Sequence, residues 1–509
     1  MKNFILSFIL AALVLPVQAN EGMWFLMHIE RLNYRDMQKM GLQLTPEEIY
    51  SVNNSSLKDA IVQFNNGCTA EIISENGLVL TNHHCGYGKI AELSTAEKDY
   101  LKDGFWAANY GEELKPENLS VRFFVRMDDV SKRILGKVTE NMTEADREAA
   151  INQEIAKIGQ ENNEGGKYTV SVKSFYNGNE FYYFVYEDYN DVRLVGTPPA
   201  NIGKFGGDTD NWEWPRHTGD FSLFRVYADQ NGNPAEYAPN NVPLKPKYHL
   251  TTSLKGFEEN DFAMIMGYPG RTNRWMPAGG IEQNVKHAYP AWVEASKTSM
   301  DVMKKYMDKD PQVNLDYASS YASIANYWKN RQGMIDALTQ HKTAESKQQA
   351  EKDFQKWASK KGNEKYAEII PVINNYYAKT NEISSHNNYL SLLLRTRMAS
   401  TPYRLGSAIE YYLQQNEAKR AELKPPLEAD IDKLYEGMYL PLEKDVLASQ
   451  LKLYSTKAKN VAPMVAEVAA ANNANDNGWN SYVDTAFKNS IFETKEKLQA
   501  FMANPDAEV

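Results

Sequence analysis

The chain has 509 residues, of which 42% are hydrophobic and 24% charged, and its 56 Lys+Arg against 66 Asp+Glu give a net charge of -10. This length and composition predict a folded protein of two or more domains and exclude an intrinsically disordered chain. An acidic chain without a basic block is not expected to bind nucleic acid or an anionic membrane surface.

The N-terminus has the pattern of a secretory signal peptide over residues 1–19. Lys2 supplies the positive charge, residues 4–17 form an apolar run, and Val17-Gln18-Ala19 places small residues around a spacer, as signal peptidase requires. A membrane-spanning helix needs about 20 apolar residues, and this run is shorter. We therefore expect cleavage before Asn20 and a periplasmic or secreted protein that does not insert into the membrane after cleavage.

Residues 20–285 are expected to be rich in β-strands. Of the 29 glycines, 24 precede residue 290, and short β-branched and aromatic runs between turn residues predict strands at 70–73, 78–80, 170–176, 181–186 and 262–266. Asn177-Gly178-Asn179 predicts a hairpin between the third and fourth of these runs. Capping-box spacing after Thr45 and after Ser94 predicts two short helices.

Residues 286–509 are expected to form an α-helical domain. Long runs rich in Ala, Lys, Glu, Gln, Leu and Tyr replace the turn-rich pattern, and apolar residues recur at spacings of three and four. The charged residues between them are expected to face solvent.

Both cysteines of the chain, Cys68 and Cys85, flank two predicted strands and the turn at residues 75–77. In an exported protein, this placement predicts a disulfide that closes a short loop and stabilises the fold by roughly 3 kcal/mol in the chain-entropy model. The clamp would also hold rigid the end of the second strand, which the adjacent histidines follow. A histidine with little freedom is suited to act as a general base that activates a hydroxyl.

His83 and His84 have two other interpretations. His83, His84 and Cys85 could be metal ligands, but adjacent residues rarely converge on one ion and no typical ligand spacing is present. We therefore expect neither a metal nor another cofactor. A histidine at a strand end is more often structural, and the residues by themselves leave that interpretation open for both.

Longer motifs carry a family resemblance. The segment from Cys68 to Leu80-Thr81-Asn82-His83-His84-Cys85 resembles the histidine region of trypsin-like serine peptidases. Residues 82–87, 206–222 and 266–270 together resemble the bacterial dipeptidyl-peptidase 7/11 family, over the whole mature chain. The resemblance implies a mixed β and α fold, in which a trypsin-like double β-barrel carries a large inserted α-helical cap.

The resemblance implies that His84 is the catalytic base and that Asp220 is the acid that orients it. The acid would accept the other imidazole N–H and stabilise the imidazolium. Asp208 and Asp210 lie in the same segment, and the chemistry of a carboxylate does not choose among the three.

The resemblance also implies a site for the free α-amine of a peptide. It assigns Asn211 and Trp212 to this site, together with Asn326 from the helical half. An amide oxygen accepts hydrogen bonds from an ammonium group, and an indole packs beside it. Asn330 is four residues further on and remains an alternative on the same helix face.

The nucleophile is expected outside this sequence. The family's serine lies in a Gly-Asn-Ser-Gly-like segment of the second barrel, and no Gly-x-Ser-Gly occurs here. Ser407 follows Gly406 within a helical pattern and is interpreted as structural. We expect a second barrel that begins around residues 248–277 and stays incomplete, and a chain that is inactive by itself.

Two functions are therefore considered. The first is a serine dipeptidyl-peptidase that releases dipeptides from oligopeptides with a free N-terminus. The second is a non-catalytic periplasmic peptide-binding fragment that keeps the amine site and the helical cap. The family resemblance also implies a possible homodimer.

Overall fold

The computed structural model describes residues 23–270, 273–471 and 476–504. The predicted signal peptide lies outside these residues. The chain divides into two compact units, and each is described by itself. The β-rich unit takes residues 1–81, 118–193 and 224–269, and the helical unit takes residues 82–117, 194–223 and 270–509.

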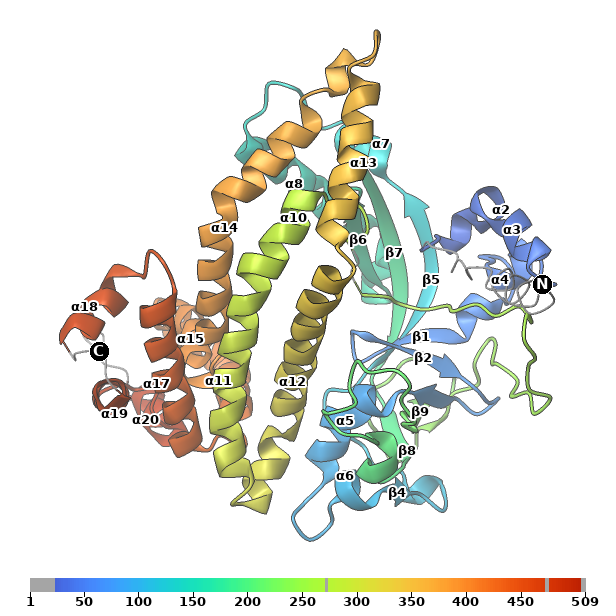
Figure 1. Cartoon of the computed structure of the whole chain (residues 1–509). Coiled ribbons are helices and arrows are strands. Elements are labelled where there is room, and N and C mark those ends of the chain that lie inside the picture. The colour runs from blue at the N-terminus through green and yellow to red at the C-terminus, as the bar shows by residue number, and fades with distance from the viewer. Residues whose placement is uncertain (1–22, 271–272, 472–475, 505–509) are drawn as a thin grey trace, which may run out of the picture. The chain divides into compact units, whose positions relative to one another are not determined.

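The β-rich unit is built on a mainly antiparallel sheet. Its strands are β1 (Ile61–Phe64), β2 (Cys68–Ile72), β3 (Leu78–Thr81), β5 (Val121–Asp129), β6 (Thr169–Phe175), β7 (Glu180–Tyr189) and β10 (Val242–Pro243), with the start of β8 (Val192–Thr197) and most of β9 (Ser222–Ala228). The strand order runs β8-β9-β3-β2-β1-β5-β7-β6, with β10 beside β9. Figure 1 shows β5, β6 and β7 as long neighbouring strands.

Local signals account for several of these elements. The predicted hairpin is present as β6 and β7, which pair from Thr169 with Tyr186 to Phe175 with Glu180. Its turn is allowed because Asn177 and Gly178 adopt φ of 56° and 86°, a region that Asn and Gly enter readily. Thr45 forms the predicted capping box of α4 (Pro46–Ile49).

Two local predictions are wrong. Residues 262–266 form no strand. Instead, Phe262, Met264 and Met266 pack against the apolar cluster of α2–α4, and no neighbouring strand pairs with them. Ser94 does not start a helix either, because its hydroxyl donates to the Ile90 carbonyl at the end of the preceding helix.

The helices of the β-rich unit either pack on its sheet or follow one another at the start of its described residues. They are η1 (Leu26–His28), α2 (Ile29–Leu32), α3 (Tyr34–Lys39), α4, η2 (Leu57–Asp59), α7 (Ser131–Leu135), α8 (Glu144–Asn162) and η4 (Glu164–Gly166). Ile134, Ile151 and Ile158 from α7 and α8 share a buried cluster with Phe181 of β7. Burial of this apolar surface fixes the two helices on the sheet.

The helical unit begins with short elements that position the site. They are α5 (His83–Leu93), α6 (Tyr100–Asp103), β4 (Phe105–Trp106), η3 (Tyr110–Glu112), the end of β8 and α9 (Ala200–Gly203). Phe105 and Trp106 of β4 pair with Thr197 and Gly196 of β8. Asp99, five residues after Ser94, caps α6 through the backbone N–H of Lys102.

Longer helices make up the rest of this unit. They are α10 (Ala278–Gln283), the π-helical η5 (Asn284–Ala288), α11 (Tyr289–Met307), α12 (Pro311–Gln340), α13 (Thr343–Ala358), η6 (Glu364–Tyr366), α14 (Ile369–Leu394), α15 (Arg397–Leu413), α16 (Glu417–Tyr435), α17 (Leu440–Lys457), α18 (Pro463–Ala471), α19 (Asp476–Lys488) and α20 (Lys495–Ala503). Figure 1 shows α11 between α12 and α14. The predicted helical character is confirmed, and the limits at residues 285 and 286 stay a prediction.

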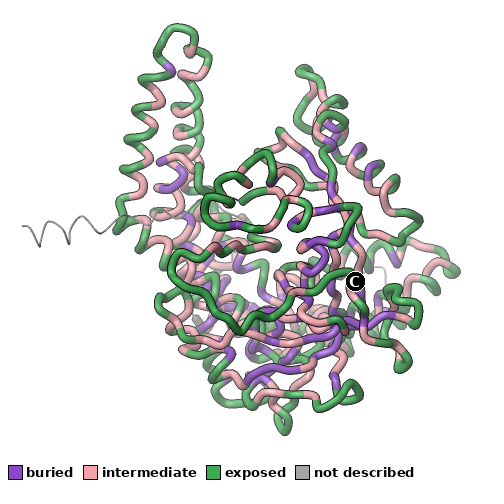
Figure 2. Tube along the Cα trace, turned by 90° about the vertical axis from the view of Figure 1, so that its right-hand side faces the viewer, coloured by how far each residue is buried: buried purple, intermediate pink, exposed green. Residues whose placement is uncertain are grey.

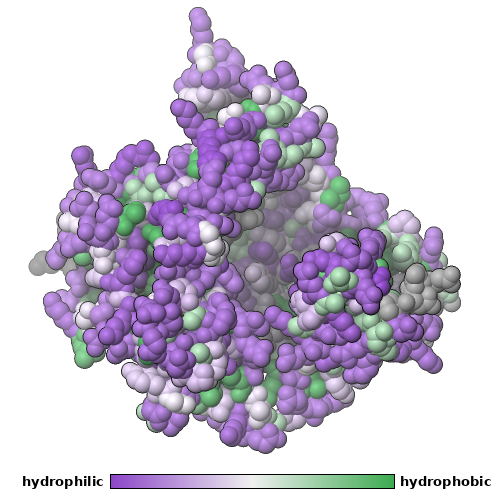
Figure 3. Space-filling model, turned by 180° about the vertical axis from the view of Figure 1, so that it is seen from behind, coloured by the Kyte–Doolittle hydropathy of each residue, from purple (hydrophilic) through white to green (hydrophobic). Residues whose placement is uncertain are grey.

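Apolar residues of the helical unit gather in several clusters. Trp479 and Val483 of α19 are fully buried against Ala295 of α11 and Tyr454 of α17. Figure 2 shows buried residues alternating with exposed ones along the chain, as an amphipathic pattern requires. The face in Figure 3 is largely hydrophilic, with small scattered apolar groups. No helix among the described residues is both long and apolar enough to cross a membrane.

Candidate active site

His84 lies in the first turn of α5, directly after β3 and Asn82. Its side chain is 70% exposed, and its Nδ1 is 2.7 Å from Asp220 Oδ2. Asp220 comes two residues before β9, from a distant part of the sequence. The structure therefore brings together the two residues that the resemblance assigned to acid–base chemistry.

Further hydrogen bonds fix the Asp220 carboxylate. The backbone N–H of His84 donates to Oδ1 at 2.9 Å, and Asn82 Nδ2 donates to Oδ2 at 3.2 Å. Ser222 in turn donates to the Asn82 carbonyl at 3.0 Å. The carboxylate is thus held at both oxygens.

Burial raises the pKa of Asp220, but hydrogen bonds from the ring and backbone of His84 outweigh that effect and hold the pKa below its usual value. The carboxylate is therefore ionised at neutral pH and accepts a hydrogen bond from His84 Nδ1–H. That tautomer leaves the lone pair of His84 on Nε2, on an exposed ring. A general base needs this state.

His83, next in sequence, is in the opposite environment. It is 1% exposed, and its ring meets the Tyr87 ring edge-on at 5.6 Å. A Cβ at Gly203 would approach the His83 ring to 2.5 Å, so a glycine is needed there. Burial lowers the pKa of His83 to about 4, which keeps this imidazole neutral and structural.

The rival carboxylates lie elsewhere. Asp208 pairs with Lys204 at 2.8 Å. The Asp210 side chain packs against Gly206, where a Cβ would approach Asp210 Oδ2 to 2.1 Å. Among the described residues, neither carboxylate is recorded within hydrogen-bond distance of His84.

Asn211, Trp212 and Asn326 form a second polar group. Asn326 Oδ1 accepts from Asn211 Nδ2 and from Trp212 Nε1, at 3.0 Å each. Asn330 instead accepts from Arg331 at 3.4 Å. The structure thus brings together the three residues assigned to the amine site and leaves Asn330 apart.

Arg216 holds this second group in place. Its guanidinium donates to Asn211 Oδ1 at 3.1 Å and to the carbonyls of Phe205 and Gly207 at 3.2 and 3.1 Å. A lysine could not reproduce this fork. The sequence motifs contain Arg216 and Asn82, but neither residue was predicted to belong to the site. The signal for Arg216 was an arginine inside a glycine-rich loop, whose backbone carbonyls a guanidinium can bind.

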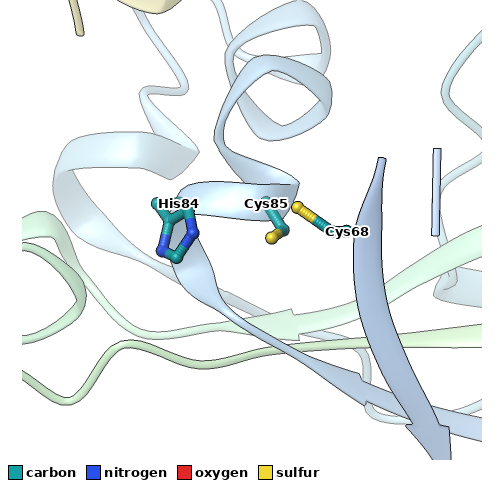
Figure 4. Close-up of side chains that lie close together, drawn as sticks. All are labelled: Cys68, His84 and Cys85. Atoms are coloured by element: carbon teal, nitrogen blue, oxygen red, sulfur yellow. The ribbon is translucent and has the colours of Figure 1, made fainter. Parts of the chain in front are cut away.

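Cys68 and Cys85 are both disulfide-bonded and neither is free, so the predicted disulfide is confirmed. Figure 4 shows their sulfur atoms facing one another, with His84 beside Cys85. His84 and the two sulfurs lie within 4.8 Å of one another, but disulfide sulfurs are not the thiolates that bind metals.

Comparison with known proteins identifies the family. The sequence profile of peptidase S46 matches residues 19–509. The chain belongs to the peptidase S46 family. It is 55% identical to dipeptidyl-peptidase 7 of Capnocytophaga gingivalis, over 100% of this chain and 72% of that protein. It is 38% identical to the Asp/Glu-specific dipeptidyl-peptidase of Flavobacterium psychrophilum, over 90% of this chain and 64% of that protein.

A protein of known crystal structure has a similar fold. The crystal structure of Porphyromonas endodontalis DPP11 in complex with the dipeptide Arg-Glu matches with a TM-score of 0.83 and 33% identity, over 96% of this chain and 71% of that one. The mixed α and β fold with a large antiparallel sheet is therefore shared with this structure.

Proposed function

We propose that this chain is the larger part of an exported serine dipeptidyl-peptidase that releases dipeptides from the free N-terminus of oligopeptides. The observation that carries the proposal is the 2.7 Å contact between His84 Nδ1 and Asp220 Oδ2 on an exposed ring. The names of the S46 relatives support the same activity. We also propose that its fold is a trypsin-like double β-barrel with a helical cap.

His84 and Asp220 supply the acid–base part of the proposed mechanism. His84 Nε2 takes the proton of the serine hydroxyl as that hydroxyl attacks the scissile carbonyl, and then gives it to the departing amine. The remaining acyl group is the dipeptide, which water releases in the second half of the reaction. Asp220 keeps the ring in the required tautomer throughout. The serine of this mechanism has no counterpart among the residues of this sequence that match the family's motifs.

The amine site sets the length of the product. Asn211 Oδ1 accepts one hydrogen bond from Arg216, and an amide oxygen has a second lone pair. An α-ammonium group that donates to this lone pair, beside the Trp212 ring, fixes the peptide at its first residue. Signal-peptide cleavage before Asn20, a periplasmic or secreted location and a possible homodimer complete the proposal.

The test compares three peptides of the same sequence, one with a free N-terminus, one N-acetylated and one extended by a residue. When the segment that carries the serine is present, the protein is expected to release the first two residues of each free peptide and far less from the acetylated one. Release of single amino acids, or equal cleavage of the acetylated peptide, would contradict the proposal.

A non-catalytic peptide-binding protein is the second candidate, favoured by the hydrogen-bonded Asn211–Trp212–Asn326 group, which needs no nucleophile to bind an amine. It predicts binding of the free peptide, weaker binding of the acetylated peptide and no release of dipeptide. Detection of released dipeptide separates the two candidates, and isothermal titration measures the peptide binding that both predict.

A further inference from the structure

The helical unit contains a solvent-open cavity, and neither His84 nor Asp220 lines it. Its volume is about 360 Å³, and α11, α12, α17 and the segment that joins α14 to α15 line it. Small-molecule pockets begin at about 300 Å³, and one water occupies only about 30 Å³ of liquid. The cavity is therefore large enough for a small organic ligand.

Two buried hydrogen-bond donors in the lining lack an acceptor. Ser296 is 0% exposed, and neither its Oγ nor Trp292 Nε1 has a partner in the described part of the chain. Ser296 follows Trp292 by one helical turn, so both face the cavity from the same side of α11. A buried donor without an acceptor destabilises a fold, so such a pair favours a ligand that supplies acceptors.

A neighbouring hydroxyl on the same helix does have a polar partner. Ser299, three residues after Ser296, also lines the cavity, and its Oγ accepts from Gln450 Nε2 at 2.7 Å. Ser296 has no equivalent amide opposite it, so it differs from Ser299 in having no polar partner among the described residues.

Arg395 adds a cation at the rim of the same cavity. Its guanidinium carbon lies 5.0 Å from the centre of the Trp292 ring, and no carboxylate or carbonyl acceptor for it is recorded within the described ranges. Arg397, also in the lining, is occupied: it donates to the carbonyls of Leu434 and Glu436. Arg395 is thus the cation that remains available to a ligand.

The charge of the lining points to an anion. Arg395, Arg397 and Glu443 are its charged residues, which gives a formal charge of +1 when all three are ionised. Glu443 does not compete for the available cation, because it accepts from Tyr317 Oη at 2.7 Å and lies 3.9 Å from Arg397.

Apolar residues form the remaining wall of the cavity. Its apolar lining includes Met303, Ile324, Leu392 and Val446. A ligand with a charged end and an apolar body matches this division between donors and hydrocarbon.

We propose that this cavity binds a small monocarboxylate with an apolar body, of the size of an amino-acid derivative or a dipeptide. The carboxylate accepts hydrogen bonds from Arg395, and Ser296 and Trp292 donate to other oxygens of the same molecule. The inference does not rest on the proposed peptidase activity, because none of these residues belongs to the His84 or Asn211 groups.

The probe is N-acetyl-L-leucine, measured by isothermal titration against the purified protein, with N-acetyl-L-leucinamide as the uncharged control. Neither probe has the free amine that the Asn211 site would recognise. The acid is expected to bind, and the amide to bind about tenfold more weakly or less, because a charge-assisted hydrogen bond is lost. Equal binding of both probes, or binding of neither, would overturn the proposal and leave a cavity that holds water alone.

Variants locate the site. Arg395→Gln is expected to weaken binding of the acid about tenfold, while Arg404→Gln, an exposed arginine further along α15 and outside the lining, leaves it unchanged. Ser296→Ala is expected to weaken binding several-fold and, without the probe, to unfold at the same or a higher temperature, because an orphan hydroxyl is removed. An affinity that persists in Arg395→Gln but falls in Asn211→Ala would assign the probe to the amine site and reject the proposal.

Discussion

The His84–Asp220 pair and the Asn211–Trp212–Asn326 group use different physical means within the same unit. The first pairs an imidazole with an ionised carboxylate that is held by three hydrogen bonds. The second consists of neutral amides and an indole, with the cationic Arg216 behind Asn211. Acid–base chemistry needs a charge that stabilises an imidazolium, whereas recognition of an ammonium needs oriented acceptors.

The largest expected effect comes from a substitution of His84, which belongs to the acid–base pair alone. In a protein that also carries the serine, His84→Ala is expected to lower kcat for dipeptide release by about 10⁶-fold, because no other group takes the serine proton. Peptide affinity should stay within about twofold, since the amine group is untouched. Steady-state kinetics and titration with the free peptide measure the two effects.

His341→Ala provides the control, because His341 is an exposed histidine at the end of α12. It is expected to keep full activity. Near-normal turnover in His84→Ala would remove His84 from the mechanism.

His83 sharpens the contrast between the two adjacent histidines. Its folded pKa of about 4 lies below the ordinary 6.5, so the unfolded chain binds more protons between these pH values. Stability is therefore lost as pH falls from about 6.5 to about 4, by about 3 kcal/mol from this residue. His83→Gln is expected to flatten this part of the dependence of unfolding free energy on pH.

Denaturant titration at pH 7 and pH 4.5 measures that slope, which is independent of any constant loss from the substitution itself. His341→Gln again serves as the exposed control and should keep the slope of the unmodified protein. An unchanged slope in His83→Gln would show that His83 is already protonated in the folded protein at pH 4.5.

These two histidines also mark the limit of what the sequence predicts. Short-range signals found the Thr45 capping box and the hairpin turn at Asn177, because both depend on a few adjacent residues. Nothing local distinguishes His83 from His84, yet one is 1% exposed and the other has a side chain 70% exposed. Gly203 and Asp220, more than a hundred residues away, create that difference.

The same limit explains the two wrong local predictions. Ser94 has capping-box spacing, but the end of α5 uses its hydroxyl and Asp99 caps the next helix. Residues 262–266 have the composition of a strand without a partner strand in the described chain. Motif resemblance, by contrast, named His84 with Asp220 and Asn211 with Asn326 across long separations.

Asn211→Ala is the next test, with a smaller expected effect. Loss of a charge-assisted hydrogen bond to the substrate amine should lower kcat/KM for free peptides by about 10- to 100-fold. Residual activity on acetylated peptides should not change. Asn330→Ala, an amide outside the group, is the matched control, and an equal loss on acetylated peptides would contradict an amine-specific role.

Arg216 gives the smallest effect because it acts through Asn211. Arg216→Lys is expected to raise KM for free peptides by about tenfold with kcat within about twofold, since the donors of a lysine leave one nitrogen and cannot replace the three separate guanidinium nitrogens that reach these acceptors. A fall in kcat at constant KM would indicate that Arg216 serves the acid–base pair instead. Circular dichroism checks that the loop variant remains folded.

The shared acceptor at Asn326 has a consequence for selectivity. Its Oδ1 receives two hydrogen bonds from within the chain, which occupy both lone pairs. Under the proposed function, an arriving ammonium group gains this oxygen only by exchange with a resident N–H. The contribution of Asn326 to affinity is then the difference between a charged and a neutral hydrogen bond, so an acetylated terminus, which has no charge to offer, gains almost nothing from the exchange.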